Sequence, residues 1–276
     1  MAYKRILTVQ DISCVGQCSM TVALPILSAC GHETCILPTA LLSTHTGGFG
    51  KPRVVYLNEL HGFMNHWKEN QITFDAILTG YLGSVQAVEL VFELADQLLS
   101  PEGLLIVDPA MADHGRLYSG LTDAYARKMM DLCRKADIVI PNATEAAMMA
   151  GMEYHAELDE GYVSELLRKA DHPCIVLTGV GYMEEKTGIL LSEKENVYHY
   201  SHDKINQNFH GTGDMFAACF TGALMQGKSK QESIRIAADY VKESISLTAR
   251  NPAHWYGIRF ESALPNLIRK LQEPTD

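Results

Sequence analysis

A short glycine-rich stretch, Gly211-Thr212-Gly213-Asp214, ends a polar loop and leads directly into the apolar segment 215–220. Glycines just before a helix leave its first backbone amides free to converge on an anion, and the helix dipole adds positive potential there. Asp214 would lie in the first turn of that helix, where its carboxylate could take a proton from a hydroxyl beside a transferring phosphate. The same four residues could also form only a turn and a helix cap, because Gly, Thr and Asp are common in both.

Polar or glycine-rich segments also follow the short apolar runs along the chain. In a parallel sheet the carboxyl ends of the strands meet at one edge, and ligands bind beyond that edge. The segments that would gather there are Gln10-Asp11-Ile12-Ser13, Ser43-Thr44-His45-Thr46-Gly47-Gly48, Gly80-Tyr81-Leu82-Gly83-Ser84, Asp108-Pro109, Pro141-Asn142-Ala143-Thr144-Glu145 and Thr178-Gly179. Their common position after strands predicts a single binding site.

The elements that must position these segments follow from the apolar pattern. Short apolar runs predict strands over 5–9, 33–37, 75–79, 104–107, 137–140 and 174–177, and amphipathic stretches predict helices over 19–30, 85–99, 121–135 and 162–169. This alternation indicates an α/β fold with a mostly parallel sheet covered by helices on both faces. Residues 188–191 and 197–200 predict a small antiparallel hairpin near one edge, and only helices are expected after Asp214.

The composition is that of a globular protein without a broad nucleic-acid surface. Of 276 residues, 47% are hydrophobic and 20% are charged, and the formal net charge is -10, whereas phosphate backbones and anionic membranes are held mainly by Lys and Arg. No apolar run approaches the roughly 20 residues of a membrane span, and no signal-peptide pattern is found. Seven scattered cysteines indicate reduced intracellular usage. We expect a cytoplasmic protein with one domain over 1–276 and no nucleic-acid or membrane partner.

Taken together, these segments resemble the motifs of the ribokinase-type small-molecule kinases, and within that superfamily those of the vitamin B6 (pyridoxal, pyridoxine and pyridoxamine) kinases. The resemblance runs from Gln10 to the helix after Asp214. Five ordered segments carry it: Ser43-Thr44-His45-Thr46-Gly47, Gly80-Tyr81-Leu82-Gly83-Ser84, Asp108-Pro109-Ala110-Met111-Ala112-Asp113, Pro141-Asn142-Ala143-Thr144-Glu145 and Gly211-Thr212-Gly213-Asp214. The resemblance implies a ribokinase-like three-layer sandwich and a homodimer.

The resemblance also implies ATP-dependent phosphorylation of the 5'-hydroxymethyl group of a pyridine. Asp214 would be the general base, because a primary alcohol becomes an adequate nucleophile only if its proton departs as the new P–O bond forms. The charge that develops on the transferred phosphoryl group would be held by the backbone amides of Gly211, Thr212 and Gly213.

ATP and Mg²⁺ would be held at the ends of the later strands. Because Mg²⁺ prefers oxygen ligands and keeps several waters, the residues matched to it, directly or through water, are Asp108, Asn142 and Glu145. The residues matched to the nucleotide are those three together with Asp113, Tyr118, Thr178 and Gly179. Asp108 and Asp113 could instead only cap loops, and Thr178-Gly179 could be only a strand-ending turn. A monovalent cation is a further cofactor that the resemblance allows.

On the acceptor side, Thr46 and Gly47 belong to the family's pyridine-contacting segment. The ring of Tyr81 could pack against the edge of the ligand, although an isolated tyrosine is often only structural. His210 stands where one branch of the B6 kinases has a cysteine that can engage an aldehyde. A histidine cannot form that thiol adduct, so His210 either closes over the substrate or is an exposed loop residue.

Asp11 is a second departure from the family pattern. Many pyridoxal kinases have Gln-Ser after the first strand, whereas this chain has Gln10-Asp11. Our hypothesis is that Asp11 pairs with the protonated pyridine nitrogen or an aminomethyl group, and that Ser13 supplies the missing hydroxyl. The alternative is that Asp11 caps a turn, as aspartates often do.

The sequence is also compatible with two other functions. A hydroxymethylpyrimidine kinase of thiamine synthesis acts on a similar alcohol, but its usual Gly-Ser-Asp opening is missing here. A catalytically silent pyridine-binding protein is the alternative of another class. Residues 222–229 fit the Walker A pattern, yet that motif needs a preceding strand. Gly222 instead falls inside the predicted apolar helix, which Gly227 is expected to end.

Overall fold

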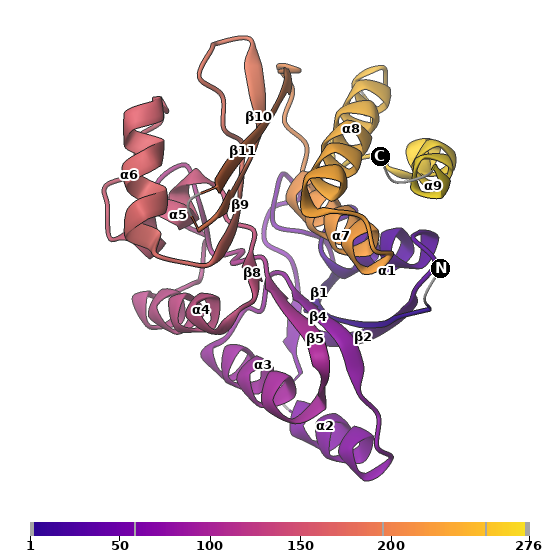
Figure 1. Ribbon diagram of the computed structural model, residues 1–276. Coiled ribbons are helices and arrows are strands. Elements are labelled where there is room, and N and C mark those ends of the chain that lie inside the picture. The colour runs from indigo at the N-terminus through magenta and orange to yellow at the C-terminus, as the bar shows by residue number, and fades with distance from the viewer. Residues whose placement is uncertain (1–2, 58, 195, 252, 274–276) are drawn as a thin grey trace.

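The computed structural model describes residues 3–57, 59–194, 196–251 and 253–273 (Figure 1). Within these residues a nine-stranded sheet has the strand order β11-β10-β9-β8-β5-β4-β1-β2-β3. Helices cover both faces of the sheet, so the chain forms three layers (Figure 1). The prediction of an α/β sandwich with a mostly parallel sheet is confirmed.

The centre of the sheet is parallel and its two edges are antiparallel. The parallel strands are β1 (Arg5–Ser13), β2 (Glu33–Leu42), β4 (Phe74–Thr79), β5 (Leu99–Val107), β8 (Ile138–Val139) and β9 (Cys174–Thr178). One edge is formed by β3 (Val54–Tyr56), and the other by the hairpin of β10 (Lys186–Glu193) and β11 (Asn196–Asp203). The predicted edge hairpin is therefore confirmed.

The helices divide into two groups, one on each face of the sheet (Figure 1). The first group comprises α1 (Met20–Ala29), α7 (Thr212–Met225), α8 (Lys230–Ala249) and α9 (Leu264–Gln272), with a short 3-10 turn, Glu261–Ala263, before α9. The second group comprises α2 (Leu60–Glu69), α3 (Val85–Leu98), α4 (Asp123–Lys135), α5 (Ala143–Ala150) and α6 (Glu160–Ala170). In agreement with the prediction, the described chain after Asp214 contains helices and no strand.

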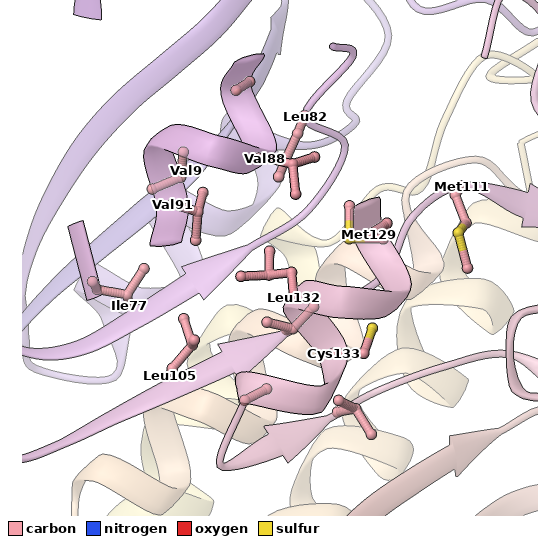
Figure 2. Close-up of a cluster of buried hydrophobic side chains, with 14 of the residues drawn as sticks. Val9, Ile77, Leu82, Val88, Val91, Leu105, Met111, Met129, Leu132 and Cys133 are labelled. Atoms are coloured by element: carbon pink, nitrogen blue, oxygen red, sulfur yellow. The ribbon is translucent and has the colours of Figure 1, made fainter. Parts of the chain in front are cut away.

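Each face of the sheet has its own hydrophobic core, because successive strand residues point to opposite sides. On β4, Ile77 packs into the core on the side of α3 and α4, whereas Leu78 packs into the core on the side of α1 and α7. Figure 2 shows part of the first core, where Val9 and Ile77 of the sheet lie in one cluster with Val91 of α3 and Met129 of α4. Burial of each such side chain contributes roughly 1.5–3 kcal/mol, and together these side chains hold the helices against the sheet.

The first two strands are longer than the apolar pattern predicts. The pattern predicts an end at Val9, but β1 continues through Ser13 and β2 through Leu42, with a bulge between Gln10 and Ile12 that keeps them paired. The reason is that two polar residues of this segment, Asp11 and Ser13, satisfy each other inside the protein. Ser13 Oγ donates a hydrogen bond to Asp11 Oδ2 at 3.1 Å.

Three further elements have no clear pattern in the sequence. They are β3, α2 and a ribbon of two very short strands, β6 (Ala112–Asp113) and β7 (Arg116–Leu117). α2 buries only Leu60 and Met64, so its apolar stripe is narrow. β6 and β7 are too short to show an alternation of apolar and polar residues.

Residues 222–229 match the Walker A pattern but do not form a phosphate-binding loop after a strand, as the sequence pattern indicated. Gly222 lies inside α7, where a Cβ would come within 2.5 Å of Cys30 Sγ, and Gly227 ends the helix with a φ of +96°. Lys228 Nζ pairs with Glu232 at 2.8 Å and donates to the carbonyl oxygen of Glu273, so it ties α8 to the end of α9. Among the described helices, none has the length and apolar character needed to cross a membrane.

Candidate active site

The polar segments that follow the parallel strands are hydrogen-bonded to one another. The amide of Asp11, in β1, donates to the carbonyl oxygen of Tyr81, which follows β4, at 3.1 Å. The amide of Met111, after β5, donates to Glu145 Oε1 at 3.0 Å. The amide of Thr178, at the end of β9, donates to the carbonyl oxygen of Pro141, after β8, at 3.0 Å. The structure thus brings the predicted segments together at one edge of the sheet.

The N-terminus of α7 is open toward this edge. Gly211 is its N-cap and has a φ of +86°, and a Cβ there would lie 2.4 Å from the carbonyl oxygen of Gln17, so only glycine fits. No side chain of the described chain caps this helix end, and the Thr212 hydroxyl donates away from it to the carbonyl oxygen of Phe209. A Cβ at Gly213 would meet open space. The first amides of the helix are therefore free to donate hydrogen bonds to an anion.

Asp214 lies in the first turn of α7, and its carboxylate is held from the other side by the start of α1. Asp214 Oδ2 accepts hydrogen bonds from the amide of Ser19 at 2.9 Å and from Cys18 Sγ at 3.3 Å. Burial raises the pKa of Asp214 above its usual value, although these two hydrogen bonds act in the opposite direction. A raised pKa makes this carboxylate a better proton acceptor than an exposed aspartate.

Asp108 lies within electrostatic reach of two other carboxylates at this edge, those of Glu145 and Asp214. Burial raises the pKa of Asp108 well above its usual value, and the negative charges of Glu145 and Asp214 raise it further. Burial also raises the pKa of Glu145. A buried carboxylate whose pKa is raised by neighbouring negative charges favours a nearby cation. The electrostatics therefore suit a divalent metal that prefers oxygen ligands, such as Mg²⁺.

The hydrogen bonds that each side-chain oxygen already accepts indicate which residues could bind such an ion directly and which only through water. Glu145 Oε2 accepts the amide of Asn142 at 2.9 Å, and Asn142 Oδ1 accepts the amides of Thr144 and Glu145, which together form a capping box at the start of α5. The side-chain oxygens of Asn142 and Glu145 thus hold the start of α5, whereas the Asp108 carboxylate accepts a hydrogen bond from the backbone of Ala110 and takes no part in this cap. The described residues contain no ready group of three His, Cys, Asp or Glu ligands. The arrangement fits a hydrated ion that Asp108 contacts and that Asn142 and Glu145 reach through water.

The remaining residues matched to the nucleotide lie around these carboxylates at different depths. Tyr118 is 39% exposed, and burial of its hydroxyl together with the charges of Glu145, Asp108, Asp113 and Asp214 raises its pKa. Asp113 is exposed, and its Oδ1 accepts the amide of His114 at 2.8 Å in the β6–β7 turn. Gly179 follows β9 with a φ of +76° and open space where a Cβ would be, so a ligand could approach its backbone.

The residues matched to the acceptor begin with Asp11, whose side chain is 3% exposed. Burial raises its pKa to about 6, the hydroxyls of Ser19 and Ser13 lower it by hydrogen bonding, and the charge of Asp214 raises it. Burial also raises the pKa of Tyr81 to about 12, with contributions from Tyr56 and Asp11. Ser13 is buried and donates to Asp11, so it supports that carboxylate. Asp11 is thus a second carboxylate beside the proposed base.

Thr46, Gly47 and His210 form the other side of the acceptor region. A Cβ at Gly47 would lie 2.0 Å from the ring of His210, so the two are in close contact. The rings of His45 and His210 are 4.7 Å apart, and burial together with His45 lowers the pKa of His210. Thr46 is exposed in the same loop.

His45 also lies in this region, although the sequence analysis assigns it no role of its own. Its Nδ1 accepts the amide of Gly47 at 2.9 Å, so the proton is on Nε2, which donates to the carbonyl oxygen of Tyr256 at 2.6 Å. His45 therefore links the Thr46–Gly47 loop to the loop after α8. Cys18 and Ser19 are likewise not predicted, because nothing in their local sequence shows that they face Asp214.

Comparison with known proteins identifies the family of the chain. A family model described as phosphomethylpyrimidine kinase matches residues 26–258. The crystal structure of a pyridoxal kinase from Lactobacillus plantarum is 30% identical, with a TM-score of 0.89 and full coverage of both chains. A Bacteroides thetaiotaomicron structure with pyridoxal, assigned to the phosphomethylpyrimidine kinases, is 32% identical over 96% of each chain, with a TM-score of 0.90. A pyridoxal kinase of Arabidopsis thaliana is 27% identical over 233 residues, which are 79% of this chain and 73% of the relative.

Fold and site together define a phosphotransferase of the ribokinase-like class that acts on an alcohol group. The parallel sheet, the open N-terminus of α7 and the adjacent carboxylates are the features that place it there. Since the family model spans most of the sequence, the chain belongs to the phosphomethylpyrimidine kinase family.

Proposed function

We propose that this protein is an ATP-dependent kinase that phosphorylates the 5'-hydroxymethyl group of vitamin B6 compounds: pyridoxal, pyridoxine and pyridoxamine. The observation that carries the proposal is the carboxylate of Asp214 in the first turn of an uncapped helix N-terminus. This arrangement offers a base and an anion site within one helical turn. The similarity to a pyridoxal kinase of Lactobacillus plantarum and to a related structure that contains pyridoxal supports the choice of substrate.

In the proposed reaction, the acceptor hydroxyl gives its proton to Asp214 as its oxygen attacks the terminal phosphorus of ATP. A new P–O bond forms, the bond to ADP breaks, and ADP leaves with that electron pair. The amides of Gly211, Thr212 and Gly213 donate to the transferred group, where negative charge develops. Bound Mg²⁺, held by Asp108 and through water by Asn142 and Glu145, would neutralise phosphate charge.

The remaining nucleotide contacts are proposed from the same geometry. Tyr118, whose pKa the nearby carboxylates raise, would cover the nucleotide, and Thr178 at the end of β9 and Gly179 after it would approach the phosphates. Asp113 would act from the exposed β6–β7 ribbon through its charge. A monovalent cation is a further proposed cofactor. Replacing K⁺ by Na⁺ in the assay below, at constant ionic strength, tests it.

For the acceptor, we propose that Thr46, Gly47, Tyr81 and His210 surround the pyridine and that Asp11, supported by Ser13, pairs with its protonated nitrogen or an aminomethyl group. An ionised carboxylate favours a cationic partner, whereas the Ser of many relatives does not. The Asp11→Ser variant should therefore lose kcat/KM for pyridoxamine more than for pyridoxal. If the order of the three vitamers does not change, Asp11 has no role in preference.

We also propose that residues 1–276 form one kinase domain, that the protein is cytoplasmic and that it forms a homodimer. All seven cysteines are free, as expected in a reducing compartment. The edge strand β3 exposes Val54, Val55 and Tyr56, an apolar strip that a second copy could cover.

The decisive experiment measures the formation of ADP and of the phosphorylated acceptor with four acceptors: pyridoxal, pyridoxine, pyridoxamine and hydroxymethylpyrimidine. We expect kcat/KM to be highest for a B6 vitamer. A higher value for hydroxymethylpyrimidine would identify the alternative enzyme of thiamine synthesis. Binding of pyridoxal without turnover of any acceptor would indicate a catalytically silent binding protein.

A further inference from the structure

We propose that Cys18 is a positioning residue for the phosphoryl-transfer reaction: its thiol holds Oδ2 of Asp214, so that Oδ1 faces the acceptor alcohol. This inference rests on the proposed function of Asp214 as the base. Both hydrogen bonds to the carboxylate, from the amide of Ser19 at 2.9 Å and from Cys18 Sγ at 3.3 Å, end on Oδ2. No hydrogen bond from the described part of the chain reaches Oδ1. One oxygen is thus anchored, and the other is available to take a proton.

The backbone that presents the thiol is locked in place. The amide of Cys18 donates to Thr21 Oγ1 at 3.3 Å, and Thr21 Oγ1 donates back to the carbonyl oxygen of Cys18 at 2.9 Å. Both neighbours of Cys18 have a positive φ, +44° at Gln17 and +54° at Ser19, a conformation that is costly for residues other than glycine. Such strain persists only where the surroundings determine it, and it is common at functional sites.

The surrounding groups leave the thiol proton for Asp214. Ser19 Oγ, whose hydroxyl also lowers the pKa of Asp11, donates to Cys18 Sγ at 3.9 Å. The sulfur therefore accepts a hydrogen bond from Ser19, and its own proton is left for Asp214. Burial and the charges of Asp214 and Asp11 raise the pKa of Cys18, so sulfur remains a neutral donor.

A thiol suits this position because it is a weak donor. It orients the carboxylate while stabilising the ionised form less than a hydroxyl would, which leaves Asp214 basic. The other groups that face Asp214 are Asp11 from β1, Asp108 from the end of β5 and Tyr118 from the loop after β7. The two carboxylates and the phenol offer Asp214 no positive charge, so within the described residues its hydrogen-bond donors come from the start of α1.

The test compares Cys18→Ala, which removes the donor, with Cys18→Ser, which keeps one. We expect Cys18→Ala to lower kcat about 10-fold with the KM values for ATP and the vitamer unchanged, because a hydrogen bond to a charged group is lost. Cys18→Ser should keep kcat within about 3-fold of wild type. Cys18→Val, a bulkier residue without a donor, should behave like Cys18→Ala. Cys14→Ala, which removes an exposed thiol elsewhere, is the matched control and should equal wild type.

A double-mutant cycle separates positioning from packing. In an Asp214→Asn background, Cys18→Ala should cause no further loss, because Cys18 acts through that carboxylate. A wild-type kcat in both Cys18→Ala and Cys18→Val, or equal losses with and without Asp214, would overturn the inference. If wild-type protein phosphorylates no B6 vitamer, the proposed function fails instead, so the two failures are distinguishable.

Discussion

Asp214 and Asp11 share one hydrogen-bonded corner of the protein, yet their surroundings prepare them for different tasks. Asp214 stands beside open helix amides and has one unbonded oxygen, which suits proton transfer. Asp11 is buried, and its carboxylate accepts the hydroxyl of Ser13; a buried carboxylate of this kind is stabilised in its ionised form by a cationic partner. Carboxylates in different environments take different chemical roles for this reason.

Replacing Asp214 by Asn tests the base directly. The amide cannot accept the proton of the alcohol, so we expect kcat to fall by about 10²–10⁴-fold. Binding of ATP should be retained, because the amides at the start of α7 are unchanged. Turnover measured together with the Kd for ATP by calorimetry checks this, and a variant with near wild-type kcat would exclude Asp214 as the base.

Asp11 should make stability depend on pH. Its pKa is raised from 3.8 to about 6, so the folded state binds its proton more tightly than the unfolded state. The cost of burying the ionised carboxylate is therefore absent below pH 3.8 and complete above about pH 6, where it corresponds to about 3 kcal/mol. The Asp11→Asn variant should gain free energy of unfolding, relative to wild type, as the pH rises from 4 to 7.

Urea denaturation of both proteins across that pH range measures the effect. The new amide changes its hydrogen bonds with Ser13 and Ser19 equally at every pH, so only the slope of the difference against pH reports on Asp11. A difference that does not change with pH would show that Asp11 ionises normally in the folded protein.

At the scale of elements, the beginning of α7 and the beginning of α1 build the site together. The left-handed Gly211 brings the start of α7 against the carbonyl oxygen of Gln17, and the loop that contains Gln17 also carries Cys18 and Ser19. The two helix starts therefore constrain each other, and a change in one should be felt in the other.

Two glycines of this helix start form a matched pair. Gly211→Ala should destabilise the protein by about 1–2 kcal/mol from its left-handed conformation alone, with a further cost from the 2.4 Å contact with Gln17. Gly213→Ala adds a methyl group into open space within α7, where Ala favours the helix more than Gly does, so the melting temperature should stay the same or rise. The KM for ATP should rise if phosphate occupies that space. Thermal melts and initial rates check both expectations; unaltered kinetics in Gly213→Ala would argue against phosphate at this position.

At the scale of the whole molecule, the sheet ends in an exposed apolar edge. Val55 of β3 is 58% exposed, and a free edge strand with such residues favours pairing with another chain. We expect light scattering to give about twice the mass of one chain, and Val55→Lys to shift the protein toward monomer because a charge would be buried at the interface. A monomeric wild type would refute the homodimer.

The sequence predicts most of the architecture because the signals involved are local. Apolar periodicity marks the strands and helices, and their alternation implies a parallel sheet whose carboxyl ends share an edge. The prediction from apolar periodicity fails at β1 beyond Val9. There the polar residues Asp11 and Ser13 belong to the strand because they satisfy each other's hydrogen bonds. It also fails at α2, which has only a narrow apolar stripe.

By itself, the sequence determined the class of fold, the order of the motifs and the carboxylates that could do chemistry, since each depends on residues close together in the chain. Only the tertiary structure decided which groups meet Asp214, because Ser19 is 195 positions away and Cys18 is 196 positions away. Raised pKa values, the proton on Nε2 of His45 and the unbonded oxygen of Asp214 likewise follow from packing. Burial and hydrogen bonding between distant segments produce them, and no local pattern records such contacts.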